Sequence, residues 1–124
     1  MTLNYEETQE FKRDLKKLLK KFRSLRKEIE VAKKAAIELF HVCEIDNRSV
    51  FEIPGFCDKE IKILKLKKFA CKALKGKGVK SGIRIIYAYH IKQMTVIFLE
   101  IYHKNDKKNE DKERIKSYLK IIGK

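Results

Sequence analysis

Hydrophobic positions near the N-terminus follow two different periods. Leu3 and Tyr5 alternate with polar neighbours, which predicts a short edge strand. Thr8 can then cap a helix, because its side-chain oxygen can accept a hydrogen bond from a free amide of the first turn. In this helix apolar residues recur every three to four positions and form one stripe: Phe11, Leu15, Leu18, Leu19, Phe22 and Leu25.

A second helical stretch follows directly. It begins near Ser24 and ends near Phe40, with apolar positions at Ile29, Ala32, Ala36 and Leu39. The two stretches form either an antiparallel hairpin or one bent helix, and the pattern allows both.

The middle of the chain is irregular. Residues 43–58 contain the single proline, Pro54, beside Gly55, which indicates a loop with a short extended piece at 49–53. Residues 61–71 are extended in pattern and heavily basic, and 73–82 hold three of the five glycines. Glycine suits a connection that leads into the next strand.

The strongest strand signal lies at 83–90 and 95–102, which are rich in β-branched and aromatic residues. The short segment 91–94 between them predicts a hairpin. After a turn at 105–109, a last helix is expected to open at Glu110 and Asp111 and to stop at Gly123. Its apolar residues fall on one face: Ile115, Tyr118, Leu119 and Ile122.

Helices at both ends and strands between them give an α+β fold class. A length of 124 residues suits one domain spanning 1–124, and 44% apolar residues are enough to build its core. We find no run long enough to span a membrane and no signal-peptide pattern, so we expect a cytoplasmic protein without a membrane partner. Cys43, Cys57 and Cys71 are odd in number and lack paired spacing, so neither a disulfide framework, a metal nor another cofactor is expected.

The net charge of +14 is concentrated in one segment. Residues 59–84 carry ten basic side chains and one acidic side chain, Glu60, which gives +9. One-signed charge of this kind is the electrostatic pattern of a phosphate-binding protein. The alternative is a solvated lysine face that serves solubility.

Three segments carry a family resemblance: Lys65–Lys68, Gly76–Tyr87 and Ile101–Lys104. In their order and spacing they resemble the RelE/ParE superfamily, the toxins of bacterial type II toxin–antitoxin systems. The resemblance covers residues 60–104, and more loosely the helices before them. It implies a compact antiparallel sheet with an N-terminal helical hairpin and a C-terminal helix, the helices packed on one face and a basic groove on the other. It also implies an antitoxin partner and, for RelE-like members, cleavage of messenger RNA on the ribosome without a metal ion.

Cleavage of RNA without metal needs a base, cations around the phosphate and an acid for the departing 5′-oxygen. Arg84 is our candidate for the phosphate clamp, because its fork of donors matches two phosphate oxygens and its strand parity points it away from the bulkier residues. Lys65 and Lys67 share one parity on the preceding strand, so either could lie beside Arg84 and act as the base. A slip of one residue would substitute Lys68.

Other basic residues are candidates for RNA binding. Lys77 and Lys80, in the glycine-rich stretch, are expected to hold flanking phosphates, as are Lys68 and Lys104. A Walker A loop is excluded here, because Val79 rather than glycine precedes Lys80 and a strand rather than a helix follows.

His103, at the end of the last strand, is the candidate general acid, because its ordinary pKa of about 6.5 lets it donate and regain a proton. Some family members place an arginine and a tyrosine after this strand, where this chain has Asn105, Asp106 and Lys107. His41 and His90 are interpreted as a helix-end and a turn histidine, with a metal site of His41, Cys43 and Cys57 as a minor alternative.

The sequence therefore predicts an endoribonuclease toxin, an mRNA interferase whose hydrolase activity inhibits growth. The competing hypotheses are a ParE-like gyrase inhibitor and a catalytically inactive RNA-binding protein. A membrane-surface protein is disfavoured, because the first helix also carries acidic residues.

Overall fold

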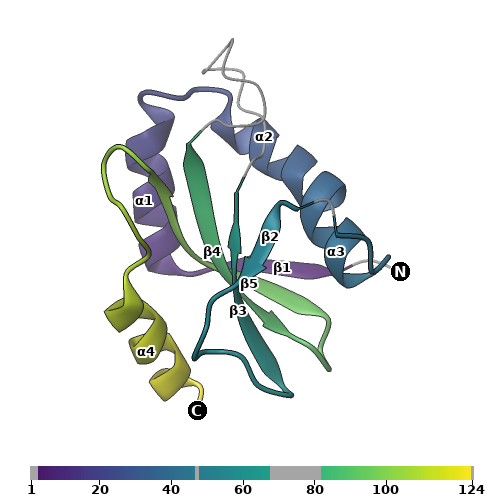
Figure 1. Cartoon of the computed structure of the whole chain (residues 1–124). Helices are drawn as coiled ribbons and strands as arrows, with labels where there is room; N and C mark the ends of the chain where they lie inside the picture. Colours follow the sequence, from purple (N-terminus) through teal and green to yellow (C-terminus); the bar gives the residue numbers. More distant parts are fainter. Residues whose placement is uncertain (1–2, 47, 68–81, 124) are drawn as a thin grey trace.

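The computed structural model describes residues 3–46, 48–67 and 82–123. Its elements follow the order β1 (Asn4–Glu7), α1 (Gln9–Leu19), α2 (Leu25–Ala32), a π-helical stretch η1 (Lys33–Glu38), α3 (Leu39–His41), β2 (Val50–Glu52), β3 (Ile61–Leu66), β4 (Ile83–His90), β5 (Thr95–His103) and α4 (Lys112–Ile121). Figure 1 shows the helices arranged around a twisted sheet. The α+β class is confirmed.

The strands that the structure describes form one sheet in the order β1-β5-β4-β3-β2. The predicted hairpin is confirmed as β4 and β5, which pair antiparallel from Ile83 with His103 to His90 with Thr95. β3 pairs antiparallel with both β4 and β2. The N-terminal edge strand is also confirmed. The expected antiparallel pairing holds for β2 to β5, whereas β1 adds to β5 in parallel. The intervening helices carry the chain back to the other edge of the sheet.

The N-terminal helices are two elements rather than one bent helix. Thr8 caps α1 as predicted, its Oγ1 accepting from the Phe11 amide at 3.2 Å. A turn at 20–24 separates α1 from α2, and α2 continues through η1 into α3. Their apolar stripes pack on one face of the sheet, where Phe11, Leu15, Leu25 and Ile29 are buried.

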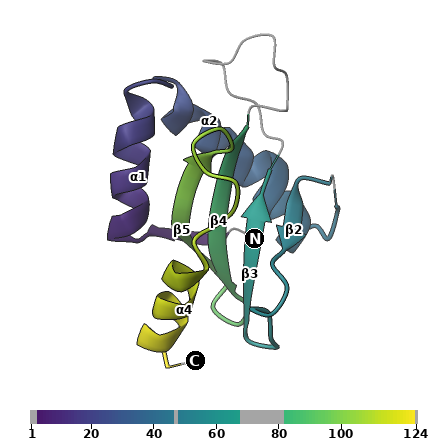
Figure 2. The same ribbon diagram turned by 60° about the vertical axis from the view of Figure 1, so that its left-hand side comes forward.

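α4 packs on the opposite face, which corrects the expectation that all helices share one side. Ile115, with Tyr118 and Leu119 beside it, contacts strand residues such as Ile86 and Leu99. Figure 2 shows α2 behind the strands and α4 in front of them. Apolar periodicity defines the inward face of a helix but not the face of the sheet that receives it. Ile122, expected inside, is 37% exposed.

A β-bulge in β5 changes which side chains share a face. Ile86 pairs with Glu100 whereas Tyr87 pairs with Phe98, so Leu99 is the extra residue. Leu99 packs in the α4-side cluster, and the Glu100 carboxylate accepts from the Asp111 amide at the start of α4. Two consecutive residues therefore point to the α4 side.

No helix among the described residues is both long enough and apolar enough to cross a membrane.

Candidate functional site

Arg84 lies on the α4 face of the sheet, as its strand parity predicted. Its neighbours Ile83 and Ile85 are fully buried on the other face, against α1 and α2. The guanidinium donates through Nη1 to the Ile83 carbonyl at 3.3 Å. Within residues 3–46, 48–67 and 82–123 no carboxylate lies within ion-pair distance of it. Arg84 is therefore a half-buried cation that no carboxylate of the described residues neutralises.

Lys65 is on the same face as Arg84. It pairs across the strands with Ile86, two residues from Arg84, so the two cations are diagonal neighbours on β3 and β4. Diagonal neighbours of this kind are roughly 7–8 Å apart. The placement of Lys65 on the face of Arg84 is the one expected from the sequence, and their binding of a phosphate stays a prediction.

A carboxylate from the segment before α4 covers Lys65. Lys65 Nζ lies 2.5 Å from Glu110 Oε1, and the two side chains are 15% and 8% exposed. Burial acts to raise the pKa of Glu110, but the Lys65 hydrogen bond, a backbone hydrogen bond and the charges of Lys65 and Lys112 outweigh it, so the pKa lies below its usual value. An RNA phosphate at Lys65 would have to replace Glu110.

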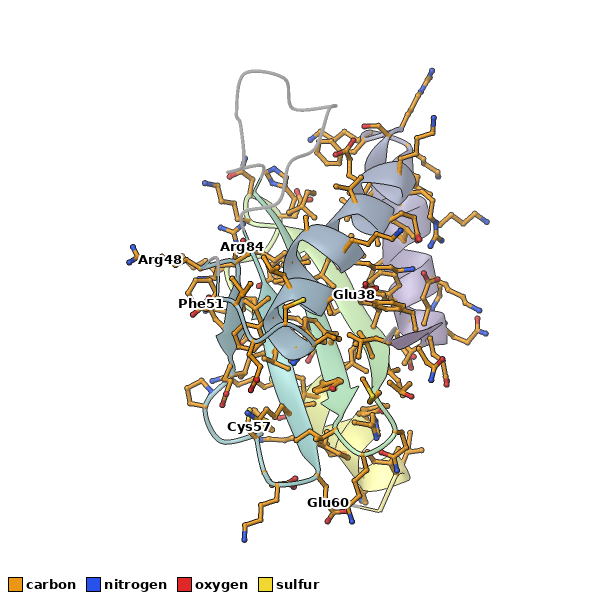
Figure 3. All side chains as sticks on the ribbon, turned by 90° about the vertical axis from the view of Figure 1, so that its right-hand side faces the viewer. Glu38, Arg48, Phe51, Cys57, Glu60 and Arg84 are labelled. Atoms are coloured by element: carbon orange, nitrogen blue, oxygen red, sulfur yellow. The ribbon has the colours of Figure 1, made fainter. Side chains whose placement is uncertain are left out.

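Lys67 lies just beyond the end of β3. Its Nζ is 4.9 Å from the centre of the Phe51 ring, and its amide donates to the Ser49 carbonyl at 2.7 Å. Lys65 and Lys67 both line a cavity of about 180 Å³. The remaining walls come from the β2 segment and Glu110: Phe51, Glu52, Ile53 and Pro54. Figure 3 shows Arg84 and Phe51 toward one end of the sheet, with Cys57 and Glu60 at the other.

Tyr102 is a third group on this face, and the sequence analysis did not single it out. It pairs directly with Arg84 across β4 and β5, so both side chains emerge on the α4 face. Burial raises the pKa of Tyr102, and the nearby Lys65 ammonium offsets only part of this rise. Lys107 Nζ lies 5.3 Å from the ring centre. Tyr102 is thus a protonated hydroxyl next to Arg84 on the neighbouring strand and near the Lys65 ammonium.

The structure does not bring His103 to Arg84 and Lys65. Its ring stacks on Phe22, with centroids 5.6 Å apart and planes 11° apart, on the α1 and α2 side of the sheet. Nδ1 accepts from the Asn105 amide at 3.0 Å, so in the neutral ring Nε2 carries the proton. Gly82 leaves room for this ring, since a Cβ there would lie 2.9 Å from Nε2. The role of His103 as an acid stays a prediction.

Of the other predicted RNA-binding residues, Lys68, Lys77 and Lys80 lie outside the described residues. Lys104 is exposed, and its amide donates to the Gly82 carbonyl at 2.8 Å. This bond places Lys104 at the end of the sheet where β4 begins.

The two remaining histidines have structural partners. His41 ends α3 as expected, and its Nε2 is 2.8 Å from the Tyr87 hydroxyl. Burial, and then the charge of Lys62, lower the pKa of His41 to about 4. His90 closes β4, with Nε2 2.6 Å from the Tyr118 hydroxyl. In the part of the chain that the structure describes, no group of three His, Cys, Asp or Glu side chains is placed to hold a metal ion.

Two solved structures share this arrangement of elements. The RelE–RelB complex from the archaeon Pyrococcus horikoshii OT3 matches with a TM-score of 0.51 at 12% identity, over 86% of this chain and 100% of that chain. An arginine-to-alanine double mutant of the E. coli toxin RelE in the free state matches with a TM-score of 0.51 at 18% identity, over 98% of this chain and 99% of that chain. No family model matches the chain, and no curated protein matches it.

Proposed function

We propose that this chain, whose fold is that of the RelE toxins, is the toxin of a toxin–antitoxin pair and an endoribonuclease that cleaves messenger RNA without a metal ion. The observation that carries the proposal is the grouping of Lys65, Arg84 and Tyr102 on one face of the sheet. Metal-free cleavage requires cations around the phosphate, an acid and a base. Arg84 and Lys65 are the cations, and Tyr102 carries a protonated hydroxyl. Lys65 or Lys67 is the candidate base.

Each group has a chemical role in this proposal. Arg84 holds the scissile phosphate and stabilises the extra negative charge of the pentavalent transition state. Lys65, with Lys67 beside it, supplies further positive charge and the candidate base for the ribose 2′-hydroxyl. Tyr102 stands nearest to Arg84 as a proton donor for the 5′-oxygen, and His103 is the second candidate for that step.

An antitoxin partner completes the proposal. One of the two similar structures is a complex of RelE with RelB. An open surface of cations would bind RNA indiscriminately, so we expect the antitoxin to place an acidic segment over Lys65, Arg84 and residues 59–84. Glu110 already shows how a carboxylate fits over Lys65.

Induced expression in bacteria tests the function directly. The expected result is growth arrest with messenger RNA cut within codons. Purified protein, added to synthetic messenger RNA with and without ribosomes, then decides whether cleavage requires the ribosome. Growth arrest with intact RNA and failed DNA supercoiling would favour the gyrase-inhibitor hypothesis instead. Normal growth, with no cleavage in either reaction, would contradict the proposal.

The Arg84→Ala variant locates the activity. Loss of one preorganised charge at a transition state typically costs about 100-fold to 1,000-fold in rate, and a half-buried strand arginine contributes little to packing. The matched control is Lys92→Ala, which removes an exposed cation at the opposite end of the β4–β5 hairpin. Cleavage rates and far-ultraviolet circular dichroism are compared. Near-native cleavage by a folded Arg84→Ala protein would remove Arg84 from the site.

A further inference from the structure

A second cationic surface covers the outer side of the N-terminal helices. Between residues 12 and 27 the chain has one acidic residue, Asp14, and nine basic ones: Lys12, Arg13, Lys16, Lys17, Lys20, Lys21, Arg23, Arg26 and Lys27. All nine are exposed. Arg26 forms an ion pair with Glu7, and the one acidic residue of the segment, Asp14, forms an ion pair with Arg114 of α4. For the other eight, the described part of the chain places no carboxylate within ion-pair distance.

The α1 part of this surface is ordered into two rows. Phe11, Leu15 and Phe22 turn inward to the sheet and are at most 3% exposed. Residues four apart on the outer side of α1 align along the helix, which gives Lys12 and Lys16 in one row and Arg13 and Lys17 in the next. Lys20, the C-cap residue, and Lys21, in the turn after it, follow the two rows directly. We call these two rows the α1 cation rows. They lie on the helices that cover the face of the sheet opposite to Arg84, so one bound strand cannot occupy both places at once without wrapping around the molecule (Figure 2).

Helix stability explains only part of the α1 cation rows. Lys16 and Lys17 lie in the last turn of α1, where positive charge interacts favourably with the helix dipole. Like charges four residues apart repel one another and destabilise a helix. A surface of mixed charges gives solubility without this cost. A bound polyanion would offset the repulsion that remains, and we take the rows as a surface suited to one.

The surroundings of the rows select the kind of polyanion. Binding of single strands relies on aromatic side chains that stack on bases, but both aromatic residues between 9 and 27, Phe11 and Phe22, are buried. A membrane-surface helix needs an apolar face turned outward, and the apolar face of α1 is packed against β5. Double-helical RNA is recognised mainly through its phosphates and its shape, which asks only for ordered cations.

We propose that the α1 cation rows bind the phosphate backbone of double-helical RNA, as a second RNA contact apart from the site at Arg84. The inference rests on the proposed function in that RNA is the partner in both. A single-stranded messenger would enter at Arg84 while a structured RNA is held by α1. This division gives the toxin a way to dock on a folded RNA that carries or surrounds its substrate.

Binding to a short blunt RNA duplex tests the inference without any cleavage. All proteins carry Arg84→Ala, so that the duplex and the comparison single strand stay intact. The test variant adds Lys16→Gln, Lys17→Gln, Lys20→Gln and Lys21→Gln. Its matched control adds Lys92→Gln, Lys108→Gln, Lys116→Gln and Lys120→Gln, four exposed lysines outside both proposed RNA-binding surfaces, so both variants lose the same charge. Affinities are measured over a range of salt concentrations.

The test variant should bind the duplex about ten-fold more weakly, or worse. Its log-log salt slope should be shallower by up to about 3.6, since each of the four lost phosphate contacts contributes about 0.9 on a duplex. The control should keep most of the affinity and slope. A DNA duplex of the same sequence and anionic vesicles should bind more weakly than the RNA duplex. Equal losses in both variants, or tighter binding of DNA or vesicles, would overturn the inference.

The folding of the test variant can be checked on the same samples. Neutral side chains remove the repulsion within the rows, so helix content should be unchanged or higher at low salt. Duplex binding by a protein that never cleaves RNA would leave the inference standing and the nuclease proposal refuted. RNA cleavage by a protein that does not bind the duplex would support the nuclease proposal and refute the inference about the α1 cation rows.

Discussion

Leu99 determines which side chain of β5 lies beside Arg84. In an uninterrupted hairpin, the pairing of His90 with Thr95 would continue so that His103 shared the face of Arg84. The extra residue at Leu99 reverses the parity of the rest of the strand and brings Tyr102 to Arg84 instead. The sequence was sufficient to identify residues with suitable chemistry, but not to predict which of Tyr102 and His103 lies beside Arg84. That depends on the bulge, and the residue types of Ile97, Phe98 and Leu99 do not indicate a bulge.

The bulge leads to a prediction on proton transfer. Tyr102→Phe should lower the cleavage rate by about 100-fold, the lower end for a general acid, because it removes only the hydroxyl. RNA affinity should stay almost unchanged, since affinity comes mainly from Lys and Arg contacts with phosphates. Single-turnover rates and binding constants separate the two effects.

His103→Gln is the comparison for Tyr102→Phe, since glutamine can still donate a hydrogen bond but cannot titrate. A wild-type rate for Tyr102→Phe together with a loss in His103→Gln would return the acid role to His103. Equal losses of rate and affinity in either variant would make that residue a binding contact only.

His41 gives a prediction on acid stability. Its pKa falls from 6.5 to about 4 in the fold, because the half-buried ring disfavours a charge. The unfolded chain therefore takes up a proton first, and stability decreases as the pH falls from about 6.5 to about 4. The full shift corresponds to at most about 3 kcal/mol, and solvent screening reduces this amount.

The His41→Gln variant isolates this contribution. Glutamine cannot titrate but can still bond to the Tyr87 hydroxyl. Urea unfolding at pH 7 and pH 5 should show a smaller loss of stability on acidification in His41→Gln than in the wild type. An identical loss in both proteins would show that His41 titrates alike in the folded and unfolded chains.

At the scale of elements, hydrophobic periodicity and capping were sufficient to locate most helices and strands. The Thr8 cap, the β4–β5 hairpin and the start of α4 at Asp111 all follow from local signals. The face on which α4 packs and the parallel pairing of β1 do not, because both depend on contacts between distant segments. The carboxylate of Glu110 over Lys65 is a consequence of that packing, so no pattern along the chain could predict it.

The link between β5 and α4 should act as an electrostatic cover. Glu110→Gln removes the charge opposite Lys65, so binding of single-stranded RNA should become tighter. The same change should lower stability at pH 7 by about 1–3 kcal/mol, because it leaves a mostly buried ammonium with a neutral partner. Fluorescence binding and urea unfolding measure the two effects.

Glu113→Gln is the control for Glu110→Gln. Its carboxylate pairs with Lys116 on the exposed side of α4 at 3.5 Å, where an ion pair contributes little. The pKa of Glu110 lies below its unfolded value, so its stabilisation is present above that value and is lost as the pH falls through the folded one. The wild type and Glu110→Gln should therefore converge in strong acid, and a difference that persists there would assign the effect to packing.

On the scale of the whole molecule, one sheet separates two apolar clusters. α1 and α2 cover one cluster, and α4 covers the other. β4 contributes to both, through Ile85 and Tyr87 on one side and Ile86 and Ala88 on the other. Loss of the helices on either side would expose apolar side chains of these shared strands. The strands in turn support the helices on the other side. The two layers should therefore be one cooperative unit, as expected for a single domain over 1–124.

Matched substitutions in the two layers test this cooperativity. Ile29→Val on α2 and Ile115→Val on α4 remove the same methylene from isoleucines that are each 1% exposed. Each should lower the stability by about 0.5–1.5 kcal/mol. In both variants, the far-ultraviolet circular dichroism of the helices and the near-ultraviolet signal of the tyrosines should follow one transition with an unchanged denaturant slope.

The tyrosines report on both faces, since Tyr87 and Tyr89 lie on the α1 and α2 side and Tyr102 and Tyr118 on the α4 side. An early, separate loss of helical signal in Ile115→Val alone would mean that α4 unfolds by itself, and the cover over Lys65 would then open independently of the fold.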